Sequence, residues 1–120
     1  MIFVYVLIGG GIGAISRFSL GKIFPYTLFG IQSSTLLANM LGCLIAGVSL
    51  HFLQSLDSKA LWIIGFCGAL TTFSSYMIEM AQLFEAKSFT SLLLLWVLHH
   101  GLCFLLFYIG YKKLPLLFIQ

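Results

Sequence analysis

The sequence contains few charged residues and almost no proline. Only 8% of its 120 residues are charged and only three are acidic, whereas soluble proteins average about 25% charged residues. Two prolines leave the apolar stretches nearly unbroken. Since 61% of the residues are hydrophobic and the mean hydropathy is +1.11, we predict an integral membrane protein. A span takes about 20 apolar residues, so this length holds four spans and no soluble domain.

Other absences exclude further classes of protein. The net charge of +3 is small and dispersed, so no nucleic-acid partner is expected. No basic segment precedes the apolar stretch 2–15, which is therefore interpreted as a span and not as a cleaved signal peptide. Cys43, Cys67 and Cys103 stand singly in different apolar segments without C-x-x-C spacing, which argues against a disulfide framework or a zinc site. We expect them to act as small apolar fillers.

The apolar pattern predicts an all-α membrane fold in one domain covering residues 1–120. The expected spans are about 2–20, 31–53, 60–84 and 89–111. In the first span, small residues recur at four-residue spacing, which allows another helix backbone to approach closely: Gly9 with Gly13, and Gly10 with Ala14. The second span carries two adjacent stripes of small residues, which predict tight packing on both: Ser34, Ala38, Gly42 and Ala46, and Thr35, Asn39, Cys43 and Gly47.

The third span contains an unusual polar stretch at residues 65–79, GFCGALTTFSSYMIE. Backbone groups that leave a helix at membrane depth must be buried in protein or line a wet cavity. Glycines, threonines and serines concentrated in a span therefore predict a broken helix at a functional site. Phe73, Tyr76 and Glu79 follow at three-residue intervals and share one helix face. Aromatic residues at this spacing usually pack in a core, but an intramembrane carboxylate favours a functional face.

Two other polar residues leave alternatives open. Asn39 lies near mid-membrane, where its amide either makes an interhelical hydrogen bond or faces a permeating anion. Arg17 lies near the end of the first span, where it either extends to the lipid headgroups or guards an aqueous mouth.

Histidines occur at the end of the second span and in the middle of the fourth. His99 and His100 are adjacent, so their side chains leave the helix in different directions, and His51 is remote from both in sequence. This arrangement disfavours haem or metal binding and favours hydrogen-bonded packing histidines.

The charge distribution leaves the orientation in the membrane undecided. With four spans, one side carries Lys59, Lys112 and Lys113, and the other carries Arg17, Lys22 and Lys87. Orientation normally follows an excess of Lys and Arg on the cytoplasmic side, and here neither side has one. We therefore predict dual topology, with copies inserted both ways and paired as an antiparallel dimer.

Taken together, these segments resemble the Fluc-type (CrcB-like) bacterial fluoride channels over nearly the whole chain. Three signatures occur in order on successive spans, and the third is the most specific: Gly9-Gly10…Gly13-Ala14…Arg17, then Thr35-Leu36…Asn39…Gly42, then Gly65-Phe66-Cys67-Gly68-Ala69-Leu70-Thr71-Thr72-Phe73-Ser74-Ser75.

The resemblance implies a channel, not an enzyme. Such a protein would conduct fluoride passively out of the cell through two pores of an antiparallel, dual-topology homodimer in the lipid of the bacterial inner membrane. The backbone carbonyls of Gly68 and Thr71 would bind a structural sodium ion at the dimer interface. Arg17 would lie at the vestibule. The residues that would line the pore by similarity are Asn39, Phe73, Tyr76, Ser74, Ser75 and Glu79.

The chemistry of these residues suits a weakly binding anion path. Amide and hydroxyl groups donate hydrogen bonds, and Thr35 is added to the pore-lining set on this ground. Aromatic rings present a positive edge. Glu79 would repel fluoride as a carboxylate, but protonated or hydrogen-bonded it can act as a donor or gate. The chain departs from the family at Tyr76, where a second phenylalanine is usual, and at Ser75, where threonine is usual.

The nearest alternative is a small multidrug-resistance exporter, which has a similar length and number of spans. Such proteins depend on a glutamate in the first span, and this chain has none there. A membrane enzyme would need a nucleophile with a paired base, and Ser74 and Ser75 lack a convincing partner. A purely structural subunit would leave the polar stretch, Asn39 and Glu79 unexplained.

Overall fold

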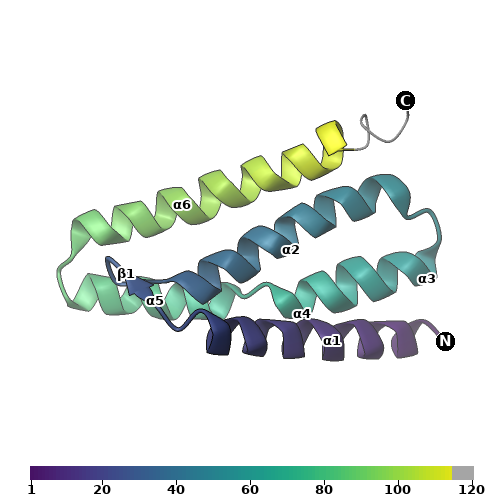
Figure 1. Cartoon of the computed structure of the whole chain (residues 1–120), viewed down its shortest axis with the longest axis horizontal. Helices are drawn as coiled ribbons and strands as arrows, with labels where there is room; N and C mark the ends of the chain where they lie inside the picture. The colour runs from purple at the N-terminus through teal and green to yellow at the C-terminus, as the bar shows by residue number, and fades with distance from the viewer. Residues whose placement is uncertain (115–120) are drawn as a thin grey trace.

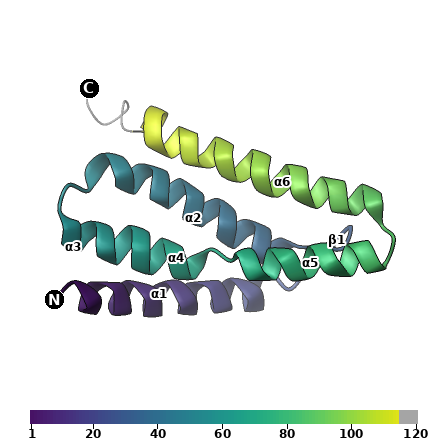
Figure 2. The same ribbon diagram turned by 180° about the vertical axis from the view of Figure 1, so that it is seen from behind.

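Four long helices lie side by side in the computed structural model, which describes residues 1–114 (Figures 1 and 2). Four helical segments are long and apolar enough to cross a membrane: Ile2–Ile23, Ser33–Phe52, Leu56–Glu85 and Phe89–Lys112. The predicted all-α, multi-pass membrane class is therefore confirmed. The helical elements are α1 (Ile2–Ile23), α2 (Ser33–Phe52), α3 (Leu56–Lys59), η1 (Ala60–Cys67), α4 (Gly68–Leu70), α5 (Phe73–Glu85), α6 (Phe89–Tyr108) and η2 (Ile109–Lys113).

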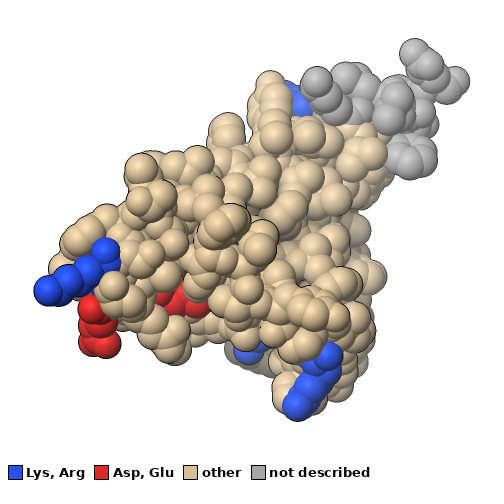
Figure 3. Space-filling model, turned by 60° about the vertical axis from the view of Figure 1, so that its left-hand side comes forward, with Lys and Arg blue, Asp and Glu red and all other residues tan. Residues whose placement is uncertain are grey.

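The surface is apolar along the length of the bundle. On the face shown in Figure 3, lysine and arginine side chains lie near the edges, and most of the surface between them is uncharged, with a few acidic side chains on the left of the view. Large side chains such as Phe3, Leu7 and Phe104 are at least 70% exposed. In water this surface would drive association, whereas in a bilayer it is solvated by lipid.

Glycines bring α1 close to the first part of the third segment. A Cβ atom at Gly9 or Gly13 would collide with the backbone carbonyls of Leu61 or Phe66 in η1. Close approach through these two glycines is thus confirmed. The second predicted pair points elsewhere, because no atom lies within 4 Å of a Cβ placed at Gly10, and Ala14 is exposed. The backbone of Gly10 is nevertheless close to the third segment, since a Cβ at Gly65 would lie 3.0 Å from the Gly10 nitrogen. Only the Ala14 part of the prediction fails within one chain.

A small β-ribbon connects α1 to α2. Strands β1 (Thr27–Leu28) and β2 (Ile31–Gln32) pair antiparallel. The connecting residues Phe29 and Gly30 have φ angles of 54° and 81°, as a two-residue hairpin turn requires. The ribbon lies near α5 (Figures 1 and 2), and a Cβ at Gly30 would come within 2.6 Å of the Leu83 side chain. The ribbon therefore packs on α5, an arrangement that periodicity did not predict.

Candidate functional site

The third apolar segment leaves helical geometry at Thr71 and Thr72. The ψ angle of Thr71 is 155°, and the φ and ψ angles of Thr72 are −146° and 112°, so both residues are extended. Helix α5 begins at Phe73, and the Thr72 hydroxyl caps it by accepting a hydrogen bond from the Ser75 N–H at 3.1 Å. Backbone groups at membrane depth here need partners from outside the helix.

Asn39 of α2 supplies two of these partners. Its Nδ2 donates to the Thr72 carbonyl at 3.2 Å, and its Oδ1 accepts from the Thr72 N–H at 2.7 Å. Both residues are buried. A Cβ at Gly42 would collide with the methyl group of Thr71, so the small residue allows the interruption to lie against α2. The interhelical hydrogen bond expected for Asn39 is confirmed, and its amide retains a second N–H.

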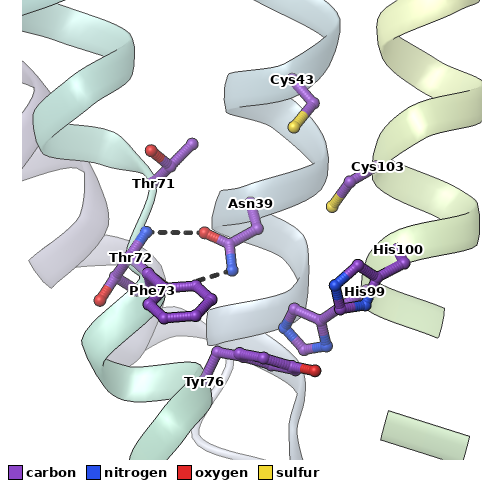
Figure 4. A pocket seen from close by; sticks show the side chains of 9 residues that line it. All are labelled: Asn39, Cys43, Thr71, Thr72, Phe73, Tyr76, His99, His100 and Cys103. Atoms are coloured by element: carbon purple, nitrogen blue, oxygen red, sulfur yellow. Dashed lines mark hydrogen bonds between the residues drawn. The ribbon is translucent and has the colours of Figure 1, made fainter. Parts of the chain in front are cut away.

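A pocket of about 350 Å³ opens beside this pairing (Figure 4). Three of the residues predicted to line a pore, Asn39, Phe73 and Tyr76, meet there. Cys43 and Cys103 also line this space. The full lining comes from α2, the interruption, α5 and α6: Asn39, Cys43, Thr71, Thr72, Phe73, Tyr76, His99, His100 and Cys103.

Aromatic rings form one side of the pocket. The centroid of the Tyr76 ring lies 5.7 Å from that of Phe73, 4.7 Å from that of His99 and 5.8 Å from that of His100. Tyr76 is 4% exposed, whereas Phe73 is 72% exposed. Phe73 therefore forms the outer edge of the pocket and Tyr76 its interior.

The histidines of α6 belong to this pocket, although the sequence-based site included no residue of the fourth span. Nδ1 of His99 lies 3.2 Å from the Leu95 carbonyl, and Nδ1 of His100 lies 2.9 Å from the Trp96 carbonyl. The expectation of hydrogen-bonded histidines is confirmed. Nothing in the local sequence indicated this, because adjacent residues leave a helix in different directions and the contacts with Tyr76 join two helices.

Glu79 and Ser75 line a second pocket, of about 340 Å³. Glu79 is 5% exposed, its Oε2 accepts a hydrogen bond from the Gln32 N–H at 3.0 Å, and its Oε1 has no hydrogen-bond partner. The hydroxyl of buried Thr35 donates to the Gln32 side chain at 3.2 Å. Because the ribbon packs on this end of α5, the face expected to carry Phe73, Tyr76 and Glu79 is divided between two pockets.

The remaining predicted residues lie at the exposed side of the interruption. Nη1 of Arg17 donates to the Thr71 carbonyl at 3.3 Å, which places the guanidinium beside the interruption. Ser74 is exposed, and its hydroxyl lies 3.1 Å from that of Thr72. Gly68 is also exposed.

Comparison with known proteins places these features in a family context. Residues 4–111 match the family model described as CrcB-like protein, Camphor Resistance (CrcB). A protein of Staphylococcus aureus (strain NCTC 8325) named Fluoride-specific ion channel FluC 1 is 35% identical over 117 residues, covering 93% of this chain and 95% of that protein. A protein of Methanococcus aeolicus named Fluoride-specific ion channel FluC is 36% identical over 107 residues, covering 86% of each chain.

Proposed function

Because the chain belongs to the CrcB-like family, we propose that it is a fluoride-selective ion channel through which the ion leaves the cell passively. The observation that carries the proposal is the Asn39–Thr72 pairing, which fixes an amide donor at the edge of a pocket that also contains Phe73 and Tyr76. Family membership and the absence of an acidic residue in α1 both argue against the multidrug exporter.

The pocket chemistry suits a small, strongly hydrated anion. A selective pore replaces the water around the ion with hydrogen-bond donors, yet must bind weakly enough to release it. The second N–H of Asn39 is such a donor, and the edge of the Phe73 ring adds a weak attraction. No lysine or arginine lines the pocket in the described part of the chain.

A growth experiment tests the proposed function. Cells that lack their own fluoride exporter should grow in fluoride when they express this chain, and expression should not protect them against toxic organic cations. The Asn39→Ala variant should lose the protection. Protection against cations but not fluoride, with the protein present in the membrane, would contradict the proposal.

We also propose that two copies form an antiparallel dimer with two pores. In one chain the pocket is edged by Phe73, which is 72% exposed, and Gly68 and Ser74 beside the interruption are exposed as well. A second copy would cover these residues and close the path to lipid. The equal distribution of lysine and arginine between the two ends supports an antiparallel arrangement.

A structural sodium ion at this interface is part of the proposal. The Thr72 N–H, which in a continuous helix would bond the Gly68 carbonyl, instead bonds Asn39 at 2.7 Å, so the exposed Gly68 carbonyl lacks that partner. Carbonyl oxygens are suitable ligands for a hard cation. The Thr71 carbonyl fits less well, because Arg17 already donates to it at 3.3 Å. We therefore assign the main ligand to Gly68, with Thr71 joining it only when Arg17 moves away.

Sodium removal tests this part of the proposal. When bound, the ion would hold two copies together, so replacing sodium with a large organic cation should abolish fluoride flux and weaken the dimer. Full flux from a stable dimer in sodium-free buffer would contradict the assignment.

A further inference from the structure

Two cysteines from different helices lie next to each other in the pocket beside the interruption. Cys43 belongs to α2 and Cys103 to α6, and both residues line this pocket. Their thiols are hydrogen-bonded to each other, and Figure 4 shows both sulfur atoms pointing into the space between the two helices. Both cysteines are free and partly exposed, so the sulfur pair borders the space that an ion would enter.

Close packing of α2 on the end of the fourth segment holds the two sulfur atoms together. One helical turn beyond the thiols, a Cβ atom at Gly47 would collide with the Phe107 carbonyl oxygen. Gly110 of η2 approaches α2 in the same way, since its Cβ would lie 2.6 Å from the Leu44 carbonyl oxygen. The helix backbones therefore touch just beyond the pair, and the thiols occupy the part of the pocket where the two helices converge.

Two neighbouring thiols suit a soft cation. Sulfur ligands select soft cations such as Cu⁺, and cations of this kind accept as few as two ligands. The residues that the structure describes contain no group of three or more His, Cys, Asp and Glu side chains able to hold a metal ion, which argues against the four protein ligands of a structural zinc site. A soft cation with two ligands is therefore the class that the pair fits.

We propose that Cys43 and Cys103 form a binding site for a soft monovalent cation such as Cu⁺, and that its occupation stops ion passage through the pocket. One thiol loses its proton to water and bonds the cation as a thiolate. The other sulfur donates a lone pair and keeps its proton. One positive charge replaces another, so the pocket gains no net charge, and no oxidant or reductant takes part.

The position of the pair accounts for the effect on passage. Cys43 follows Asn39 by four residues, one turn along the same face of α2, so the cation lies near the amide that is proposed to bind fluoride. A pore must bind its ion weakly enough to release it. A fixed cation holds the anion more strongly and also fills part of the pocket. This effect on flux rests on the proposed function, whereas binding of the cation does not.

Silver retention tests the site itself. Ag⁺ has the charge and ligand preference of Cu⁺ and is stable in air, so silver nitrate is added to the purified full-length protein in chloride-free detergent buffer. A monothiol is then titrated in, and the silver that remains on the protein is measured after desalting. Because two linked ligands bind much more tightly than one, Cys43→Ser and Cys103→Ser should each release silver at a monothiol concentration at least about tenfold lower than the wild type does.

Cys67 provides the matched control. It is also a free cysteine, but it is buried and does not line the pocket. The Cys67→Ser variant should therefore retain silver as the wild type does.

Alkylation of the wild-type protein gives a second measurement without any substitution. Bound silver should slow maleimide modification of Cys43 and Cys103 to the same extent, read by mass spectrometry of the peptides. Protection of only one of the two cysteines would overturn the pairing.

Fluoride efflux from liposomes in sodium nitrate tests the effect on passage. Silver should abolish efflux through the wild type and through Cys67→Ser, and a dithiol should restore it. In the presence of silver, Cys43→Ser and Cys103→Ser should each keep the flux that the same variant has without it.

The inference and the proposed function fail in different ways. The inference is overturned if both single variants hold silver as tightly as the wild type, since binding to single thiols then accounts for the result, or if silver occupies the pair without reducing flux. Absence of fluoride efflux from the wild type before silver is added would instead contradict the channel, and silver retention and alkylation would still decide the site.

Discussion

At the scale of single residues, Asn39 connects two elements through one side chain. Replacing it with alanine removes both hydrogen bonds to Thr72 and leaves a buried backbone N–H and carbonyl unpaired. We expect the free energy of unfolding to fall by about 1–3 kcal/mol, measured by thermal or denaturant unfolding in detergent.

An Asn39→Asp variant is the matched control, because it keeps the acceptor for the Thr72 N–H and removes the donor. Its ionised carboxylate would lie buried against the Thr72 carbonyl, so this variant should be at least as unstable as the alanine variant and should also lose fluoride flux. If both variants unfold like the wild type, the pairing does not stabilise the interruption.

Glu79 makes a different kind of contact. Its Oε2 accepts from the Gln32 N–H, and glutamine can supply the same acceptor without a charge. We therefore expect Glu79→Gln to fold normally and to change the rate of fluoride passage, measured in liposomes. Unchanged flux would show that Glu79 stabilises the ribbon only.

The sequence indicates which polar groups need hydrogen-bond partners, but it does not indicate which residues provide them. Asn39 was expected to find an interhelical partner, and residues 65–79 were expected to carry unusual backbone. Asn39 and the extended backbone at Thr72 pair with each other only because α2 packs against the third segment. Local periodicity does not encode that packing. The roles of His99 and His100 were missed for the same reason, since their neighbour Tyr76 comes from another helix.

At the scale of elements, glycine contacts fix how α1 packs. A Cβ at Gly13 would collide with the Phe66 carbonyl, whereas no atom lies within 4 Å of one at Gly11 on the same helix. Gly13→Ala should therefore destabilise the protein by about 1–3 kcal/mol through overpacking. Gly11→Ala should leave it unchanged or raise its stability by about 0.5–1 kcal/mol. Equal unfolding temperatures for the two variants would contradict this packing.

The presence of four spans was predictable from the apolar runs. The ribbon was not, because two-residue strands carry no periodic signal and Phe29 adopts a positive φ angle of 54° that is uncommon outside glycine. The ribbon also affects the candidate site, because the Gln32 N–H bonds Glu79 and both residues line the second pocket.

At the scale of the whole molecule, the balanced charges lead to a prediction about insertion. The α1 start and the end of η2 lie at one end of the bundle, and the ribbon and the α5–α6 connection lie at the other (Figure 1). With three lysine or arginine residues at each end, we expect a cysteine tag after the C-terminus to be labelled from both sides of the membrane. Labelling from a single side would exclude dual topology.

Adding lysines to one end of the bundle should remove the balance of positive charge between the two ends and fix the orientation in the membrane. Two lysines introduced into the connection at residues 54–55 should drive all copies into one orientation and, if the functional unit is antiparallel, abolish flux.

Fluoride efflux from liposomes that contain the purified protein tests the central claim most directly. Efflux is read with a fluoride electrode, and chloride efflux is followed in parallel. The account predicts rapid fluoride release without chloride release, and its loss on substitution of Asn39 or Phe73. No fluoride release from a protein that is folded, dimeric and supplied with sodium, or equal release of chloride, would contradict it.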